Sequence, residues 1–190
     1  ILSDVFKAIV FTRTKHGADK VVRYLKEKGL ESTAIHGNKT QGQRQRSLEM
    51  FKKDKINILV ATDIAARGID IDEVSHVVNF DMPNVPESYV HRIGRTARAG
   101  SDGIAISLCD GSEVPYLKDI EKLIQQKIPR EKVMEDGTRK EVFYDPMEDN
   151  IDYSKPKRNR SGKPGGKKKS HRGKRPNRNS KAEYLSLIHI

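Results

Sequence analysis

The chain has 190 residues and a formal net charge of +11, from 37 Lys or Arg against 26 Asp or Glu. This length allows one ordinary domain with an extension. Residues 155–181 hold 13 Lys or Arg and no acidic residue, whereas residues 1–154 hold 24 basic and 25 acidic residues. The excess charge therefore belongs to one segment, and the rest of the chain is near neutral. The single Cys109 excludes an intrachain disulfide framework and a cysteine-based zinc site.

The sequence contains neither an apolar run of membrane-spanning length nor a signal-peptide pattern. We therefore expect a cytoplasmic location and no membrane partner. The chain begins with Ile1 instead of Met, and we interpret it as a piece of a longer protein.

Short apolar runs alternate with helical patterns along the first 110 residues. The first helix has apolar residues at helical spacing from Ala18 to Leu25, and Gly29 lies just past its end. A second helix at 41–51 is expected to turn Leu48 and Phe51 inward. Strands are expected at residues 8–11, 32–35, 56–61, 74–80 and 103–108.

Two more helices complete the pattern. Asn84 is the expected N-cap of the third helix, and Pro86 and Glu87 suit its first turn. The closing helix is marked by Leu117, Ile120 and Ile124. Strands that alternate with helices in this way predict a parallel sheet with helices on both faces. In such sheets ligands gather at the carboxyl ends of the strands.

The pattern decays after about residue 130. The expected organisation is a domain at 1–130, a mixed acidic extension at 131–153, a disordered Lys/Arg/Gly-rich tail at 154–184 and a terminal sequence at 185–190. The tail composition cannot bury enough apolar surface to offset the entropy of ordering. The last six residues differ in character from the rest and are interpreted as non-native. An amphipathic terminal helix is the alternative, but six residues cannot sustain one.

Three arginines lie three residues apart in the segment 89–101, directly after the third predicted helix: Arg92, Arg95 and Arg98. Each guanidinium is always charged and matches two phosphate oxygens at once. A solvated basic loop is the simpler alternative. The clustering of charge favours a polyanion opposite these side chains.

A second candidate segment follows the strand at 56–61. Thr62 and Asp63 end this strand, and Arg67 and Gly68 precede Asp70. The small side chains of this turn let a phosphate approach its backbone N–H groups. The competing interpretation is a helix cap at Thr62 and Asp63, with a local ion pair between Arg67 and Asp70.

Four blocks of the sequence resemble, in order, the C-terminal RecA-like domain of a DEAD-box RNA helicase of superfamily 2. Val10-Phe-Thr-Arg-Thr-Lys15 resembles motif IV, and His36-Gly with Gln41-Gly-Gln-Arg44 resembles the Gln-x-x-Arg block. The segments 61–70 and 91–98 resemble motifs V and VI. The match covers roughly residues 5–125 and departs at Ala97, where many members have glycine.

The resemblance implies a fold: an α/β, RecA-like three-layer α/β/α sandwich with a mostly parallel sheet, followed by the disordered basic tail. It also implies ATP as cofactor, with Mg²⁺ held mainly by an N-terminal RecA-like domain absent from this chain. The chain has no phosphate-binding Walker loop and no Asp-Glu-Ala-Asp box. This fragment alone is therefore expected to be inactive, and the full-length protein to be an RNA-dependent ATPase and helicase.

The same resemblance assigns residues to the nucleotide. Arg95 and Arg98 would act as arginine fingers on the γ-phosphate. Asp70 would bind the ribose, with Gly68 beside the nucleotide. His91 and Arg92 would link the nucleotide site to the RNA-contacting segments, although a helix histidine bonded to a carbonyl is the alternative for His91. Arg67 would bridge to the acidic motif of the absent domain, and no metal ligands are expected in the chain itself.

RNA contacts are expected from donors that suit phosphate and sugar oxygens instead of base edges. The candidates are Thr12, Arg13, Gly37, Gln41, Arg44 and Thr62. An exposed helix face is the alternative for Gln41 and Arg44. RNA and the N-terminal RecA-like domain are thus the implied partners, and a looser similarity to bacterial ribosome-assembly helicases adds ribosomal or RNA-decay complexes.

Two other functions remain open. A non-catalytic RNA-binding adaptor would keep the fold but lose the arginine loop, and the presence of Arg92, Arg95, Arg98 and Asp70 argues against it. A superfamily 2 DNA helicase would share the architecture, although the residues of the segments 61–70 and 91–98 favour the RNA helicases. A comparison of RNA with DNA as stimulators of ATP hydrolysis separates the two helicases.

The basic segment generates the first testable prediction. Its 13 positive charges should attract nucleic acid in a salt-dependent way, because bound cations release counterions from phosphates. Deletion of residues 155–181 should flatten the dependence of RNA affinity on salt concentration, measured by fluorescence anisotropy. An unchanged slope would mean that this segment is not an RNA tether.

Overall fold

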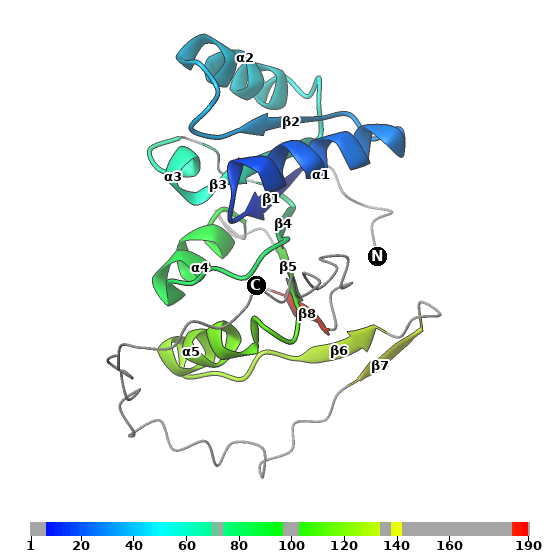
Figure 1. Cartoon of the computed structure of the whole chain (residues 1–190), viewed down its shortest axis with the longest axis vertical. Coiled ribbons are helices and arrows are strands. Elements are labelled where there is room, and N and C mark those ends of the chain that lie inside the picture. Colours follow the sequence, from blue (N-terminus) through cyan, green and yellow to red (C-terminus); the bar gives the residue numbers. More distant parts are fainter. Residues whose placement is uncertain are drawn as a thin grey trace, which may run out of the picture. The chain divides into compact units, whose positions relative to one another are not determined.

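The computed structural model describes residues 7–69, 71, 74–96, 103–133, 138–141 and 184–189 (Figure 1). The helices are α1 (Lys15–Glu27), α2 (Gln41–Lys52), α3 (Asp63–Ala66), α4 (Pro86–Ile93) and α5 (Val114–Ile124). The strands are β1 (Ala8–Thr12), β2 (Ser32–Ile35), β3 (Ile58–Thr62), β4 (His76–Asn79), β5 (Ile104–Cys109), β6 (Arg130–Val133), β7 (Arg139–Glu141) and β8 (Tyr184–His189).

The described strands form one sheet in the order β2-β3-β1-β4-β5-β8-β6-β7. The first five strands in this order are parallel, and β8, β6 and β7 add antiparallel pairs beyond β5. The mostly parallel α/β sheet predicted from the alternating pattern is thereby confirmed. The chain starts in the middle of the sheet, builds β2 and β3 on one side of β1, and then crosses to build β4 and β5 on the other.

Helices cover both faces of the sheet because successive strand residues point in opposite directions. One face packs Val10 and Val60 against Ala18 and Val21 of α1. The opposite face places residues such as Ile9, Leu59 and Val77 in a cluster with Phe51 of α2, as the sequence predicted for Phe51. A further cluster joins α4 and α5 through the buried Tyr89, Leu117 and Ile120, together with Cys109. Cys109 is thus a core thiol.

Helix starts differ from the predictions at one position. Thr14 caps α1 by accepting a hydrogen bond from the Gly17 N–H at 3.0 Å. Thr40 and Gln43 form a reciprocal capping box at the start of α2. The predicted cap Asn84 is wrong, because α4 starts after Val85, which makes no side-chain cap bond. Pro86 at the first helical position fixes φ in advance and supplies the start signal in place of a cap.

The other differences lie after residue 130. The sequence predicted no regular structure in the acidic extension, yet β6 and β7 pair there in antiparallel register. The terminal segment, treated separately in the sequence analysis, forms β8 and pairs with both β5 and β6. Its alternation of apolar residues suits a strand that fills the open edge of β5. The non-native origin of residues 185–190 stays a prediction, and most of the basic tail lies outside the described residues.

No helix in the described part of the chain is both long and apolar enough to cross a bilayer.

A buried carboxylate fixes the chain where it leaves α5. The side chain of Glu121 is only 3% exposed and accepts two hydrogen bonds from Arg130, at 2.7 and 2.8 Å. It also accepts the backbone N–H of Ile128 at 3.0 Å. This carboxylate therefore anchors the segment that leads into β6.

Substitution of Glu121 by alanine should lower the free energy of unfolding by about 3 kcal/mol, because it leaves the Arg130 guanidinium and a buried N–H without their acceptor. Urea unfolding of the 190-residue chain measures the effect. The matched control is Glu27→Ala on exposed α1, for which a change within about 0.5 kcal/mol is expected. Equal free energies of unfolding for the two variants would contradict the proposed anchoring role of Glu121.

Candidate nucleotide and RNA interface

The carboxyl ends of three strands meet at one edge of the sheet. Thr12 of β1 lies in register with Thr62 of β3, and Phe11 lies beside Asn79 of β4. The strand order reverses direction at β1, so the loops after β1 and β4 diverge there. This is the place where open α/β sheets bind ligands.

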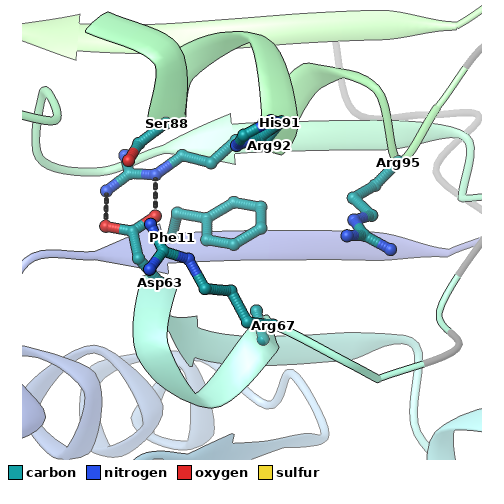
Figure 2. A pocket seen from close by; sticks show the side chains of 8 residues that line it. Phe11, Asp63, Arg67, Ser88, His91, Arg92 and Arg95 are labelled. Carbon is teal, nitrogen blue, oxygen red and sulfur yellow. Dashed lines mark hydrogen bonds and ion pairs between the residues drawn. The ribbon is translucent and has the colours of Figure 1, made fainter. Parts of the chain in front are cut away.

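An ion pair between the buried Arg92 and the partly exposed Asp63 joins α4 to the end of β3 (Figure 2). Arg92 of α4 is 1% exposed and donates from Nε to Oδ1 of Asp63 at 2.6 Å and from Nη2 to Oδ2 at 2.7 Å. Both carboxylate oxygens are therefore engaged by one planar guanidinium, the strongest arrangement of such a pair. The pair fixes the start of α3 against the last turn of α4.

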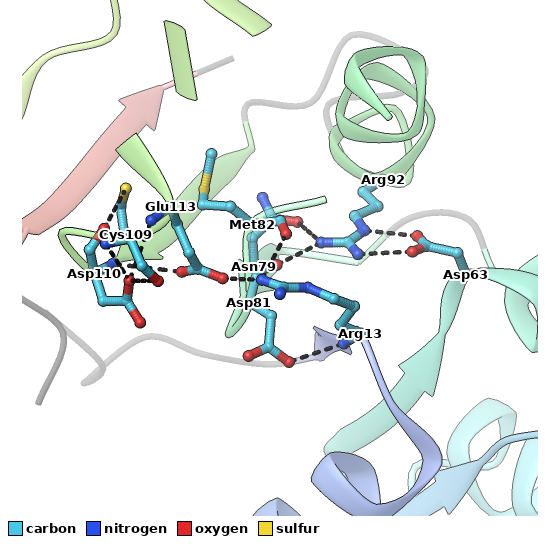
Figure 3. Close-up of polar contacts among 10 residues, drawn as sticks. Arg13, Asp63, Asn79, Asp81, Met82, Arg92, Cys109, Asp110 and Glu113 are labelled. Atoms are coloured by element: carbon cyan, nitrogen blue, oxygen red, sulfur yellow. Dashed lines mark hydrogen bonds and ion pairs between the residues drawn. The ribbon is translucent and has the colours of Figure 1, made fainter. Parts of the chain in front are cut away.

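The remaining donor of Arg92 reaches the end of β4 (Figure 3). Its Nη1 donates to Oδ1 of Asn79 at 3.1 Å and to the carbonyl of Asp81 at 2.8 Å. The guanidinium also lies 5.1 Å from the centre of the Phe11 ring. Arg92 is thus surrounded on every side by its own chain. Loss of the Asp63 carboxylate would leave this buried guanidinium without two of its acceptors, which is destabilising.

Two further arginines line a small hollow beside this pair. Arg67, which follows α3, and Arg95, which follows α4, both border it, as does His91. Arg67 and His91 are exposed, whereas Arg95 is partly exposed and donates to the carbonyl of Ile69 at 3.4 Å. Figure 2 shows Arg67 on the segment that follows α3 and Arg95 on the segment that follows α4. The ion pair between Arg92 and Asp63 joins these two segments.

The size of the hollow limits what the chain can hold by itself. Its volume of about 30 Å³ admits about two water molecules and no nucleotide. The donor set around it nevertheless fits a phosphate group, since three arginines and a single carboxylate line it and Arg92 already occupies that carboxylate. Gly68 follows with φ of +71°, a conformation that favours glycine. Asp70 and Arg98 lie outside the described residues.

The structure gives two of the predicted RNA contacts partners within the chain. Thr12 is buried, and its hydroxyl donates to the carbonyl of Thr14 at 3.2 Å. Arg13 pairs with the carboxylate of Glu113 and donates to the carbonyl of Met82 at 3.3 Å (Figure 3). Burial raises the pKa of Glu113, although a backbone N–H of Asp110 and the charge of Arg13 oppose the rise.

The other predicted RNA contacts differ in exposure. Gly37 and Gln41 are exposed, while Thr62 is half-buried. Arg44 is partly buried and donates to Oε1 of Gln41 at 3.3 Å and to the carbonyl of Ala65 at 3.2 Å. Arg44 therefore ties α2 to α3 and keeps Gln41 beside it.

The loop that carries Gly37 is clasped to α1. The buried His36 lies with Nε2 at 3.1 Å from Oδ1 of Asp19, and its Nδ1 accepts the N–H of Asn38 at 3.3 Å. These contacts select the tautomer that carries its proton on Nε2. Lys39 donates to the same Asp19 oxygen at 3.0 Å. Burial alone would raise the pKa of Asp19, but His36 and Lys39 outweigh it and hold the pKa below its ordinary value.

Sequence reasoning missed the partners that fix these groups: Asp19, His36, Asp63 as the partner of Arg92, and Glu113. Asp63 was interpreted as a possible helix cap, and it does open α3, but its carboxylate goes to a residue 29 positions away. Glu113 lies 100 positions from Arg13. No local signal marks such pairs. Within the described residues, no group of three or more His, Cys, Asp or Glu side chains is placed to hold a metal ion.

Residues 2–100 match the model of the helicase conserved C-terminal domain. The ATP-dependent RNA helicase CshA of Listeria monocytogenes serovar 1/2a is 50% identical over 121 residues, which are 64% of this chain and 23% of that protein. The chain thus spans about a quarter of that relative.

Solved structures of DEAD-box proteins agree with this match. E. coli SrmB bound to the regulator of ribonuclease activity A is similar with a TM-score of 0.63 and 41% identity, over 66% of this chain and 74% of that one. S. cerevisiae Dbp5 bound to RNA and ADP BeF3 is similar with a TM-score of 0.58 and 38% identity, over 64% and 33%. The chain therefore belongs to the family of helicase conserved C-terminal domains, and it contains a C-terminal RecA-like domain of the DEAD-box type.

Proposed function

We propose that this chain is the C-terminal half of an ATP-dependent DEAD-box RNA helicase. In this proposal, Arg95 and Arg98 contribute guanidinium groups to ATP that the N-terminal RecA-like domain of the same protein holds. Mg²⁺ would be bound mainly by that domain. The observation that carries the proposal is the arginine set at the carboxyl edge of the sheet, where Arg92 is neutralised by Asp63 while Arg67 and Arg95 border the hollow.

The physical argument concerns where charge is needed. Phosphoryl transfer spreads negative charge over the equatorial oxygens of the γ-phosphate, and a positioned guanidinium stabilises that charge. Arg95 and Arg67 lie on segments that the Arg92–Asp63 pair holds in place. Closure of the two domains would therefore bring an already oriented Arg95 to the phosphate and Arg67 to the acidic motif of the other domain. Such preorganisation removes the cost of orienting the donors during the reaction. Arg92 serves as a positioning residue in this scheme, because all three of its nitrogens donate to acceptors within the chain.

RNA binding is the second part of the proposal. A groove of about 320 Å³ beside α2 is lined by Gln41, Arg44, Arg67 and Gly68. It therefore brings predicted RNA-binding residues next to predicted inter-domain and nucleotide-binding residues. The groove offers guanidinium and amide donors, which suit a phosphate backbone and give no base readout. In this proposal, Thr12 and Arg13 position the RNA-binding surface through their contacts within the chain.

The remaining predictions concern the whole protein. The relatives are named as an ATP-dependent RNA helicase and as a DEAD-box protein bound to RNA, which supports RNA and ATP as ligands here. A cytoplasmic location and partners in ribosomal or RNA-decay complexes stay predictions. The chain alone is expected to be inactive as an ATPase.

Substitution of Arg95 by alanine in the full-length parent should lower the RNA-stimulated kcat for ATP on the order of a thousandfold, because one charge-stabilising donor is lost in the transition state. RNA affinity should stay within about threefold, because Arg95 makes no proposed RNA contact. Steady-state ATPase assays and RNA titrations measure the two quantities. The control is Arg23→Ala on the exposed side of α1, which should leave both unchanged. Near-normal turnover of the Arg95 variant would remove the arginine-finger assignment.

A further inference from the structure

The turn that carries Gly37, at residues 36–39, lies among the predicted RNA contacts. It follows β2, whose last residue Ile35 is in register with Ala61 of β3, one residue before Thr62. It leads into α2, which begins at Gln41. Because β2 and β3 are parallel, the turn and the end of β3 lie at the same edge of the sheet, the edge at which α/β sheets bind ligands. The Gly37 turn therefore belongs to the proposed RNA interface.

Neither backbone conformation nor packing among the described residues explains why position 37 is a glycine. The Lys39 N–H donates to the His36 carbonyl at 2.9 Å, so Gly37 and Asn38 are the central residues of a β-turn, and both are exposed. The φ of Gly37 lies outside the left-handed region, and an added Cβ would meet no described heavy atom within 4 Å. The missing side chain thus leaves room for a ligand to approach the backbone from outside, as a phosphate of RNA would.

Two residues on one face of α1 hold the Gly37 turn. Oδ1 of Asp19 lies 3.1 Å from Nε2 of His36 and accepts a hydrogen bond from Nζ of Lys39 at 3.0 Å. Lys15 donates from Nζ to Oδ1 of Asn38 at 3.0 Å. Residues 15 and 19 share a face of the helix because they are four positions apart. Together they contact the turn at both of its ends and at its tip.

Asp19 acts on the backbone of the turn through the imidazole ring of His36, which is 1% exposed. The carboxylate accepts the proton carried by Nε2, which leaves Nδ1 as an acceptor. Nδ1 then accepts the backbone N–H of Asn38 at 3.3 Å. With its proton on Nδ1 instead, the ring would present a second donor to this N–H, and the turn would lose the bond. Asp19 therefore selects the tautomer that fixes the shape of the turn.

We propose that Asp19 is a positioning residue for RNA binding. Through His36 and Lys39 it holds the Gly37 turn in the shape in which the turn backbone meets an RNA phosphate. A carboxylate repels phosphate, so Asp19 acts through its neighbours and not by contact with RNA. The inference rests on the proposed RNA-binding function and deepens it by naming a residue that a search for phosphate donors passes over.

The sign of the effect tests this role, because removal of a carboxylate should by itself strengthen RNA binding. Asp19→Ala in the full-length parent should instead raise about fivefold the concentration of ten-nucleotide uridine RNA that half-saturates ATP hydrolysis. The kcat at saturating RNA should stay within about twofold. Asp19→Asn should bind RNA within about twofold of the parent, because its amide oxygen accepts the same hydrogen bonds. The matched control Glu27→Ala removes the same charge from the exposed end of α1 and should not weaken RNA binding.

A second substitution tests the contact itself. Gly37→Ala fits the conformation of the turn and meets no described atom, so it should not lower the midpoint of thermal unfolding. The added methyl group should nevertheless obstruct the approach of the phosphate and raise the same half-saturating RNA concentration about fivefold.

Unchanged or tighter RNA binding by Asp19→Ala would overturn the positioning role and leave the RNA-binding proposal in place. Equal weakening by Asp19→Ala and Asp19→Asn would overturn the route through the hydrogen bond to His36. Normal RNA binding by Gly37→Ala would remove the turn from the RNA interface, and the inference with it. Failure of RNA to stimulate ATP hydrolysis by the unsubstituted parent would instead contradict the proposed function on which the inference rests.

Discussion

The two-point bond between Arg92 and Asp63 is the constraint on which the proposed site depends. It ties α4 to the start of α3, and the third donor group of the same guanidinium reaches the end of β4 through Asn79 and Asp81. Three segments that are distant in the sequence therefore hold one geometry at the carboxyl edge of the sheet. A buried guanidinium is stable at this position because each of its three nitrogens has an acceptor, so the loss of a single acceptor is destabilising.

The Arg92–Asp63 pair shows that two kinds of arginine, which look alike in the sequence, have different roles in the structure. Arg92 is bound by acceptors of its own chain and holds the neighbouring segments in place. Arg67 and Arg95 border the hollow from the segments that the Arg92–Asp63 pair joins. A domain that contributes half of a split site needs such rigidity, since its donors must already point correctly when the other half arrives. The loop with Gly37, on the proposed RNA side, is held in place in a similar way, because His36 and Lys39 both contact Asp19 of α1.

The sequence predicted the five parallel strands, the four longer helices and the edge at which the candidate residues meet, because apolar periodicity and strand-end placement are local signals. It did not predict which charged residues pair, since Arg92 with Asp63 and Arg13 with Glu113 are joined only by the fold. It also missed β6, β7 and β8, whose pairing depends on tertiary context more than on intrinsic preference. Thr12 and Arg13 illustrate the limit of the approach: the residue types suit RNA, but the structure gives each a partner of its own.

A structure of the full-length parent bound to single-stranded RNA and ADP with beryllium fluoride would test most directly whether Arg95 contacts the γ-phosphate position. We expect the Arg95 guanidinium to leave the carbonyl of Ile69 and to lie within about 3 Å of a fluoride at the γ-phosphate position, with the Arg92–Asp63 pair intact. An Arg95 side chain that still contacts Ile69, more than about twice that hydrogen-bond distance from the fluoride, would contradict it.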